Sequence, residues 1–192
     1  SEYRVFDHST DPARDLGVAV VLEVQDTPDT SLYDQELGEG YGYLTMRDGV
    51  QLSVMVRFPN PDLYGPAPYP TVIEYSGYSP SDPDEPQPST LLANLMGFAV
   101  VGVNMRGSGC SGGVFDVFSP AQAADGYDVV ETVARQPWVL HGRPGMVGLS
   151  YPGISQLYVA ATRPPHLAAI APMSVIDDLW RQQWPGGVYN SG

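Results

Sequence analysis

The chain has 192 residues, of which 43% are apolar and 16% are charged, values typical of a globular domain with one sizeable core. Its formal net charge of −13 arises from 22 acidic residues against 9 basic residues, all of them arginine. This acidity argues against nucleic acid or an anionic membrane as a partner. The lack of lysine excludes a Walker-type phosphate lysine, a Schiff-base lysine and a Ser–Lys dyad.

A single cysteine, Cys110, cannot form an internal disulfide and gives no reason to expect an oxidising compartment. The sequence has no run of about 18 apolar residues and no basic, apolar leader. These features favour a cytoplasmic location and argue against a membrane partner. We also expect neither a cofactor nor a bound metal ion.

Residues 1–40 have weak periodicity and are interpreted as a leader or as the tail of an upstream segment, with one strand predicted at 16–24. From Tyr41 the pattern sharpens. Apolar residues alternate on both sides of Asp48-Gly49, a pair that suits a tight turn, and this predicts a β-hairpin. The predicted core of the domain spans residues 41–173.

Apolar runs predict four further strands, at 71–75, 98–103, 146–149 and 167–171. Helices are predicted between them, at 90–96, from Pro120 to Ala134, and at 153–162. Strands that alternate with helices at this spacing predict a mostly parallel sheet with helices on both faces. The opening hairpin would form the antiparallel edge of that sheet.

The helix that starts at Pro120 has the clearest start signal in the chain. Ser119 is its predicted N-cap, and Gln122 would complete a reciprocal capping box with it. Its acidic residues are expected on a solvated or lightly paired face: Asp125, Asp128 and Glu131.

The run Gly148-Leu149-Ser150-Tyr151-Pro152-Gly153 ends a predicted buried strand and opens a predicted helix. It is typical of a nucleophile elbow, in which a serine on a strained turn needs small neighbours. The second glycine comes one place later than in the strict G-x-S-x-G pattern, and Pro152 is acceptable in the first turn of a helix. We expect Ser150 to be a nucleophile and the amide of Tyr151 to face a developing oxyanion.

A glycine-rich run, Gly107 to Gly112, matches the G-x-G-x-x-G pattern of dinucleotide-binding proteins after a predicted strand. Such a fingerprint opens directly into a helix whose N-terminus holds the pyrophosphate. Here the predicted helix starts only at Pro120. A dinucleotide-binding domain therefore remains the weaker alternative.

Several stretches together resemble the Xaa-Pro dipeptidyl-peptidase and cocaine-esterase (CocE/NonD) family, which also contains α-amino acid ester hydrolases and acylases. Their order and spacing fit the family from about Tyr41 to Trp180. The stretches are Arg47-Asp48-Gly49-Val50, Tyr75-Ser76-Gly77-Tyr78, Val103 to Gly109, Ser111-Gly112-Gly113, Gly126-Tyr127-Asp128, Gln136-Pro137-Trp138 and Gly148 to Gly153.

The resemblance implies an α/β-hydrolase fold and a serine hydrolase that transfers the acyl group of an ester, amide or peptide to water through an acyl-serine intermediate. It also implies that the oxyanion hole combines the Tyr151 amide with a tyrosine hydroxyl that maps onto Tyr78, although the neighbouring Tyr75 is an alternative. Asn104 departs from the pattern, because relatives often carry aspartate there. Arg106 is expected to brace its loop and not to touch the substrate.

A serine needs a base, and α/β-hydrolases supply an acid and then a histidine later in the chain than the serine. His8 and His141 precede Ser150, and His166 follows it with no acid in between. Two acids at 177–178 are followed by no histidine. Chain order therefore assigns none of these residues to a catalytic triad.

We therefore expect this chain to be a fragment of a hydrolase with little or no turnover of its own. Residues 174–192 resemble the beginning of the family's helical cap, so the sheet would be truncated at the C-terminus. An uncovered apolar strand edge predicts self-association. A non-catalytic binding module with an α/β-hydrolase-like fold is the other alternative.

Overall fold

A computed structural model describes residues 2–9, 11–20, 30–176 and 178–189. The chain divides into two compact units, Ser1–Ser31 and Leu32–Gly192. In the first, β1 (Glu2–Asp7) pairs antiparallel with β2 (Arg14–Val20). The strand predicted at 16–24 overlaps β2, and its remaining residues lie outside the described ones. The predicted boundaries at residues 40 and 173 stay predictions.

The second unit is built on a six-stranded sheet with the order β3-β4-β6-β5-β7-β8. The hairpin strands pair antiparallel around the predicted Asp48-Gly49 turn, and β4 pairs antiparallel with β6. The remaining neighbours are parallel. The predicted mixed sheet with an antiparallel edge is therefore confirmed. Its strands are β3 (Gly40–Thr45), β4 (Gln51–Arg57), β5 (Thr71–Ser76), β6 (Ala99–Asn104), β7 (Gly145–Leu149) and β8 (Ile170–Met173).

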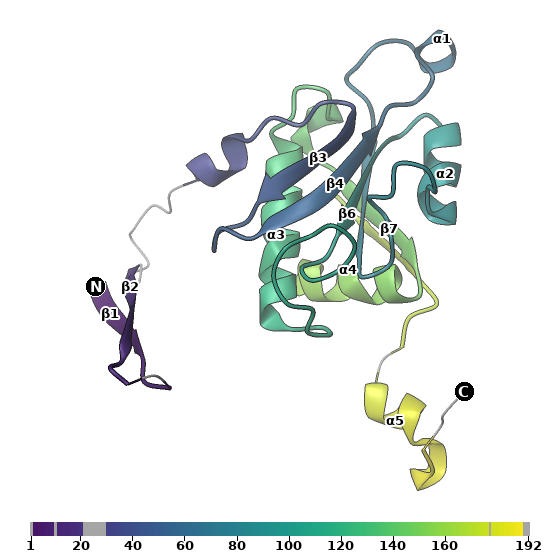
Figure 1. Cartoon of the computed structure of the whole chain (residues 1–192). Helices are drawn as coiled ribbons and strands as arrows, with labels where there is room; N and C mark the ends of the chain where they lie inside the picture. Colours follow the sequence, from purple (N-terminus) through teal and green to yellow (C-terminus); the bar gives the residue numbers. More distant parts are fainter. Residues whose placement is uncertain (1, 10, 21–29, 177, 190–192) are drawn as a thin grey trace. The chain divides into compact units, whose positions relative to one another are not determined.

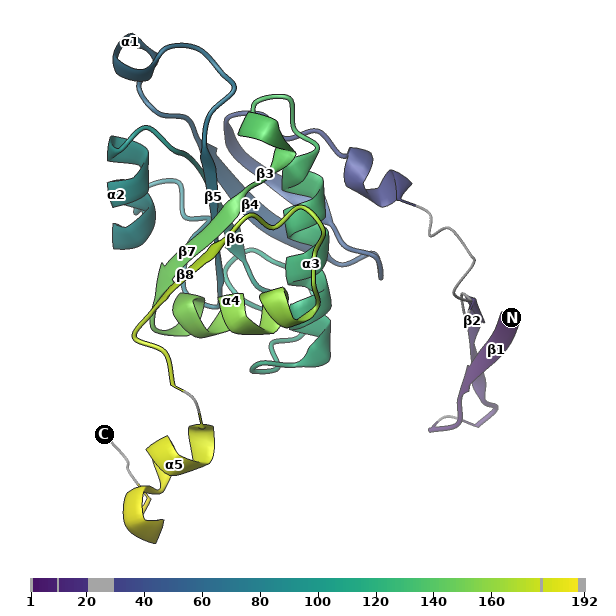
Figure 2. The same ribbon diagram turned by 180° about the vertical axis from the view of Figure 1, so that it is seen from behind.

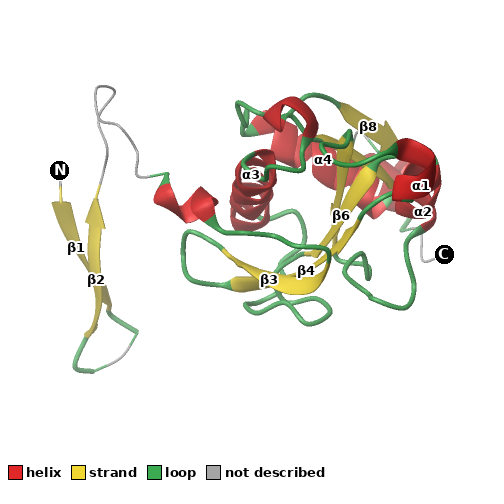
Figure 3. Ribbon diagram, turned by 90° about the horizontal axis from the view of Figure 1, so that it is seen from above, coloured by secondary structure: helices red, strands yellow, loops and turns green. Residues whose placement is uncertain are grey.

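Helices cover both faces of this sheet. Helix α2 (Pro88–Leu95) lies on one face, while α3 (Pro120–Ala134) and α4 (Tyr151–Ala161) lie on the other (Figures 1 and 2). Figure 3 shows the strands between these two layers. Every residue of β6 is buried, as its apolar run predicts. Shorter helical segments are Ser31–Asp34, α1 (Pro61–Tyr64), Leu140–Gly142, α5 (Leu179–Gln183) and Pro185–Gly187.

Strand β8 starts three residues later than the strand predicted at 167–171. The turn after α4 extends through Leu167, whose amide donates to the carbonyl of Pro164, so the extended backbone begins only at Ile170. The prediction found the strand but misplaced its ends, which local sequence patterns define least well.

Helix α3 corrects two further predictions. Ser119 is the N-cap, and its hydroxyl accepts a hydrogen bond from the Gln122 amide at 3.4 Å. The reciprocal half of the capping box is wrong, because the Ser119 amide donates to the carbonyl of Asp116 at 3.2 Å and not to the side chain of Gln122.

The prediction that the acidic residues of α3 lie on a solvated or lightly paired face is wrong about their exposure. Asp125, Asp128 and Glu131 are all buried. Asp128 accepts hydrogen bonds from the Arg47 guanidinium at 2.6 and 3.0 Å and from the Tyr33 hydroxyl at 3.1 Å. These partners lie far away in the sequence and compensate the charge that burial would otherwise penalise.

The buried carboxyl group of Glu74 lies in the middle of β5 and is 1% exposed. Burial raises its pKa from an ordinary value of 4.5 to about 7, although the Ser89 hydroxyl donates a hydrogen bond to it. Because the folded state holds this proton more tightly than the unfolded state, ionisation costs stability as the pH rises from 4.5 towards 7. A shift of this size corresponds to about 3 kcal/mol.

We therefore expect Glu74→Gln to stabilise the protein more at neutral pH than at acidic pH. The free energy of unfolding of the variant minus that of the parent chain should rise by about 3 kcal/mol from acidic pH to pH above 7. At acidic pH, Glu74 is protonated in both the folded and the unfolded parent chain. Urea unfolding across this pH range measures the difference. Glu36→Gln removes an exposed carboxylate and controls for the loss of one negative charge. A difference in free energy of unfolding that does not change with pH would refute the claim that burial raises the pKa of Glu74.

Self-association through the outer edge of β8 stays a prediction. The strand has only four residues, and Pro172 offers no N–H to a neighbouring strand, which blunts this edge. If association occurs here, Met173→Lys should lower the mass measured by light scattering, because Met173 is 42% exposed at the strand end. Leu63→Lys, on α1 and away from the sheet, is the control. An unchanged mass in Met173→Lys would locate any association elsewhere.

Candidate active site

Three loops meet where the parallel strands of the sheet end. Strands β5 and β6 end in register at the Ser76–Asn104 pair, and β7 ends at Leu149. Because the carboxyl ends of parallel strands lie at one edge of a sheet, the segments that follow them converge there. The sequence therefore brings Tyr78 and Ser150, which are 72 positions apart, to the same edge.

Ser150 lies between β7 and α4 in a strained backbone conformation, with φ 66° and ψ −119°. Non-glycine residues rarely adopt a positive φ, and such strain is concentrated at functional sites. The Ser150 amide donates to the carbonyl of Met173 at 2.9 Å, and its own carbonyl accepts from Gly153 at 2.8 Å. These bonds hold the turn while the side chain stays exposed.

Two glycines make this turn sterically feasible. A Cβ atom on Gly148 would lie 2.5 Å from the Cβ of Pro152, and one on Gly153 would lie 2.4 Å from the carbonyl oxygen of Met173. Real Cβ atoms do not approach so closely, so both positions need glycine. The second glycine comes one place later than in the strict pattern for a steric reason. In this chain, residue 153 is the one that lies against the backbone of β8.

The hydroxyl of Tyr78 lies 3.4 Å from Ser150 Oγ. The Tyr78 side chain is about half exposed, at 48%. Tyr75, the alternative, is buried in the core, and its hydroxyl donates to the carbonyl of Gln122 at 2.9 Å. The structure therefore brings Tyr78, and not Tyr75, to the serine.

Aromatic side chains surround Ser150. The Tyr151 ring packs against Phe118 with a centroid distance of 4.9 Å and against Tyr78 at 5.8 Å. A cavity of about 270 Å³ opens among them, and Ile154 also lines it. Burial raises the pKa of the Tyr151 phenol. Tyr151 is the first residue of α4, so its amide has no carbonyl one helical turn earlier in that helix and lies at the positive end of the helix dipole.

Comparison with known proteins identifies the family of this chain. A profile of the X-Pro dipeptidyl-peptidase (S15) family matches residues 48–192. The chain belongs to this family. The cocaine esterase of Rhodococcus sp. (strain MB1 Bresler) is 35% identical over 149 residues, which cover 74% of this chain and 25% of the esterase.

Solved structures of related hydrolases share the fold of this S15-family chain. A CocE/NonD family hydrolase from Staphylococcus aureus matches with a TM-score of 0.65 and 31% identity over 74% of this chain and 28% of that one. An α-amino acid ester hydrolase matches in fold with a TM-score of 0.61, at 22% identity over 84% and 30% of the two chains. The α/β-hydrolase fold implied by the resemblance is thereby confirmed. The chain spans only about a quarter of the length of the curated relatives it matches.

The two histidines of the second unit lie away from the serine of this S15-family chain. His141 comes just before β7, at the end of that strand opposite Ser150. His166 follows the C-terminus of α4, whose eleven residues separate it from Ser150 by roughly 16 Å of helix. Its Nδ1 pairs with Glu131 at 2.7 Å instead. Within residues 30–176 and 178–189, no histidine lies beside Ser150.

Arg106 braces the loop that follows β6, as expected. Its guanidinium donates hydrogen bonds to Asp125 at 2.6 and 2.7 Å and to Asp48 at 2.9 Å, and the hydrogen bonds to Asp125 raise the pKa of Arg106.

The glycine-rich run Gly107 to Gly112 lacks the arrangement of a phosphate loop. The amide of Gly107 donates to the carbonyl of Gly112, and the amide of Gly112 donates to Gln51, so both are already occupied.

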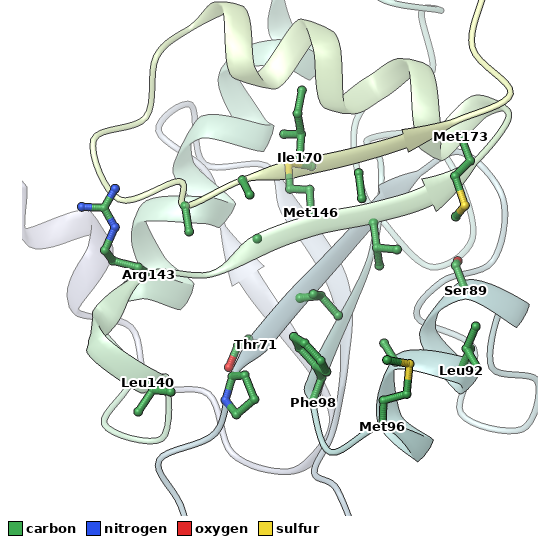
Figure 4. A pocket seen from close by; sticks show the side chains of 18 of the residues that line it. Thr71, Ser89, Leu92, Met96, Phe98, Leu140, Arg143, Met146, Ile170 and Met173 are labelled. Atoms are coloured by element: carbon green, nitrogen blue, oxygen red, sulfur yellow. The ribbon is translucent and has the colours of Figure 1, made fainter.

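A larger, apolar cavity of about 690 Å³ lies on the α2 face of the sheet, between α2 and the strands β5, β7 and β8 (Figure 4). Leu92 and Met96 line it from the α2 side, and Met173 lines it from β8. Neither Ser150 nor Tyr78 lines it, so this cavity is separate from the candidate site.

Within the described residues, no cluster of three or more His, Cys, Asp or Glu side chains could hold a metal ion. The helices of the same residues also include none with the length and apolar character of a membrane span.

Proposed function

We propose that this chain carries the nucleophile and the oxyanion-binding half of a serine hydrolase active site. Ser150 Oγ would attack the carbonyl carbon of an ester, amide or peptide. The amide of Tyr151 and the hydroxyl of Tyr78 would hold the oxyanion. The observation that carries the proposal is the Tyr78 hydroxyl 3.4 Å from the oxygen of a serine held on a strained strand-to-helix turn.

The proposed reaction proceeds through an acyl-serine. The Oγ–carbon bond forms as the serine proton passes to hydroxide of the solvent, and the carbonyl π electrons move onto the oxygen that faces Tyr78 and Tyr151. The tetrahedral intermediate collapses as the carbon–heteroatom bond breaks and the alcohol or amine leaves with a proton. Water then hydrolyses the acyl-serine and regenerates the hydroxyl.

The aromatic lining of the 270 Å³ cavity supports an apolar group next to the reacting carbonyl. Phe118, Tyr151 and Ile154 would contact it. Both ester and amide substrates fit this arrangement, because Ser150, Tyr78 and Tyr151 contact only the carbonyl group that the two share.

Slow turnover by residues 1–192 alone is part of the proposal. The two histidines of the second unit lie away from Ser150, and a serine without a neighbouring base is a weak nucleophile. The same observation favours the second candidate, a binding module with the fold of a hydrolase and no catalysis.

Covalent labelling separates the two candidates. Incubation with an excess of an alkyl fluorophosphonate at mildly alkaline pH, followed by peptide mass spectrometry, should give a slow, single adduct on Ser150 and none in Ser150→Ala. Hydrolysis of p-nitrophenyl acetate by the parent should stay close to that of Ser150→Ala. Absence of an adduct on Ser150 would refute the nucleophile and favour the binding module; rapid stoichiometric labelling would refute the lack of a base.

A further inference from the structure

Asn104 is a buried polar residue at the end of the apolar strand β6, and it is 1% exposed. It lies in register with Ser76, two residues before Tyr78. A polar side chain in this place needs partners, because a buried amide without hydrogen bonds costs stability. Three of its four hydrogen bonds join it to the loop that carries Tyr78, and the fourth joins it to Ser108 in the loop that follows β6.

The side-chain amide of Asn104 makes four hydrogen bonds. Its Oδ1 accepts from the amide of Ser81 at 3.0 Å and from the Ser81 hydroxyl at 2.6 Å. Its Nδ2 donates to the carbonyl of Tyr78 at 2.8 Å and to the Ser108 hydroxyl at 3.3 Å. A backbone amide can only donate and a carbonyl can only accept, so the partners define which end of the Asn104 side chain is oxygen.

This arrangement requires an amide. An aspartate in the same pose could still accept from Ser81, but its second oxygen would face the carbonyl oxygen of Tyr78, and two acceptors repel each other. The fit is close: a Cβ atom on Gly109 would lie 2.5 Å from Asn104 Nδ2. The same loop also packs directly against the backbone of Gly102 in β6. A Cβ atom on Gly102 would lie only 1.9 Å from the carbonyl oxygen of Pro80, so this contact needs glycine.

We propose that Asn104 is a positioning residue for the oxyanion site: its donated hydrogen bond to the Tyr78 carbonyl, together with its two bonds to Ser81, holds the Tyr78 hydroxyl beside Ser150. Asn104 touches neither the serine nor the substrate and acts through Tyr78. The inference rests on the proposed function, since it assigns Tyr78 a role in binding the oxyanion.

The first test is a double-mutant cycle on the rate of Ser150 phosphonylation. Asn104→Asp should slow labelling by about tenfold or more in the parent chain, because the Tyr78 donor is displaced. In a Tyr78→Phe background it should cause little further loss, since the donor is already absent. Equal losses in both backgrounds, or no loss in the parent, would overturn the positioning role. Asn94→Asp is the matched control, because the Asn94 side-chain amide likewise donates to backbone carbonyls, those of Arg57 and Phe98. This variant should label at the parent rate.

A second readout does not depend on reactivity. In protein labelled with ¹³C-tyrosine, Ser150→Ala should shift the Tyr78 ring signals in the parent and in Asn94→Asp, because the hydroxyl loses its neighbour. In Asn104→Asp the same mutation should leave them unmoved, while thermal unfolding shows that the variant is folded. If the Tyr78 signals still respond in Asn104→Asp, the inference fails even if Ser150 labels. If they behave as expected but Ser150 never labels, the proposed function fails and the positioning of Tyr78 stands.

Discussion

Tyr78→Phe is expected to slow the reaction of Ser150 with a fluorophosphonate by about 10² to 10³-fold, the effect of removing one oxyanion donor. The phosphonyl oxygen takes the place of the carbonyl oxygen of a substrate, and phenylalanine keeps the ring that packs on Tyr151 while removing the hydroxyl 3.4 Å from Ser150 Oγ. The second-order rate constant, measured by intact mass spectrometry, checks this prediction.

Tyr43→Phe is the matched control for Tyr78→Phe, because Tyr43 has the same 48% exposure but lies on the edge strand β3. It should label at the parent rate. A Tyr78→Phe variant that also labels at the parent rate would remove Tyr78 from the oxyanion site and leave the Tyr151 amide as its remaining proposed donor.

Gly153→Ala should destabilise the chain and abolish labelling of Ser150. The new Cβ would lie 2.4 Å from the carbonyl oxygen of Met173, the same oxygen that accepts the Ser150 amide, so α4 must move away from β8 and the turn must open. Overpacking of this kind costs typically about 1 to 3 kcal/mol. Urea unfolding and labelling of the same preparation measure both effects.

Gly38→Ala provides the control for Gly153→Ala, since nothing lies within 4 Å of a Cβ at Gly38. It should change neither stability nor labelling by much. Normal labelling of a folded Gly153→Ala variant would show that the turn does not depend on the contact with Met173.

The parts of the fold that depend on neighbours in sequence were predictable. The hairpin follows from Asp48-Gly49 between alternating residues, and the turn at Ser150 follows from the flanking glycines. In both cases the physical requirement, a tight turn or room for a backbone, is met by residues within a few positions. The mixed sheet follows from the alternation of such local elements.

The parts that depend on distant partners were not predictable in the same way. Asp125 and Asp128 look like solvated helix residues because their arginines, Arg106 and Arg47, lie in other segments. The choice between Tyr75 and Tyr78 also required the structure, since the two tyrosines lie three positions apart at the end of one predicted strand and only Tyr78 reaches Ser150.

In the sequence, Asn104 stands out only as a departure from the family pattern. Its role depends on hydrogen bonds to Tyr78 and Ser81, more than twenty positions away. A signal was present nevertheless: one polar residue ends an otherwise apolar strand next to the glycine-rich loop. A polar residue buried at the carboxyl end of a parallel strand is well placed to hold the loops that carry the site.

The crystal structure of the chain phosphonylated at Ser150 tests the proposed oxyanion site most directly. The account predicts that the phosphonyl oxygen lies at hydrogen-bond distance, about 2.7 to 3.1 Å, from both the amide nitrogen of Tyr151 and the hydroxyl oxygen of Tyr78. An adduct whose phosphonyl oxygen points into solvent, away from both donors, would contradict it.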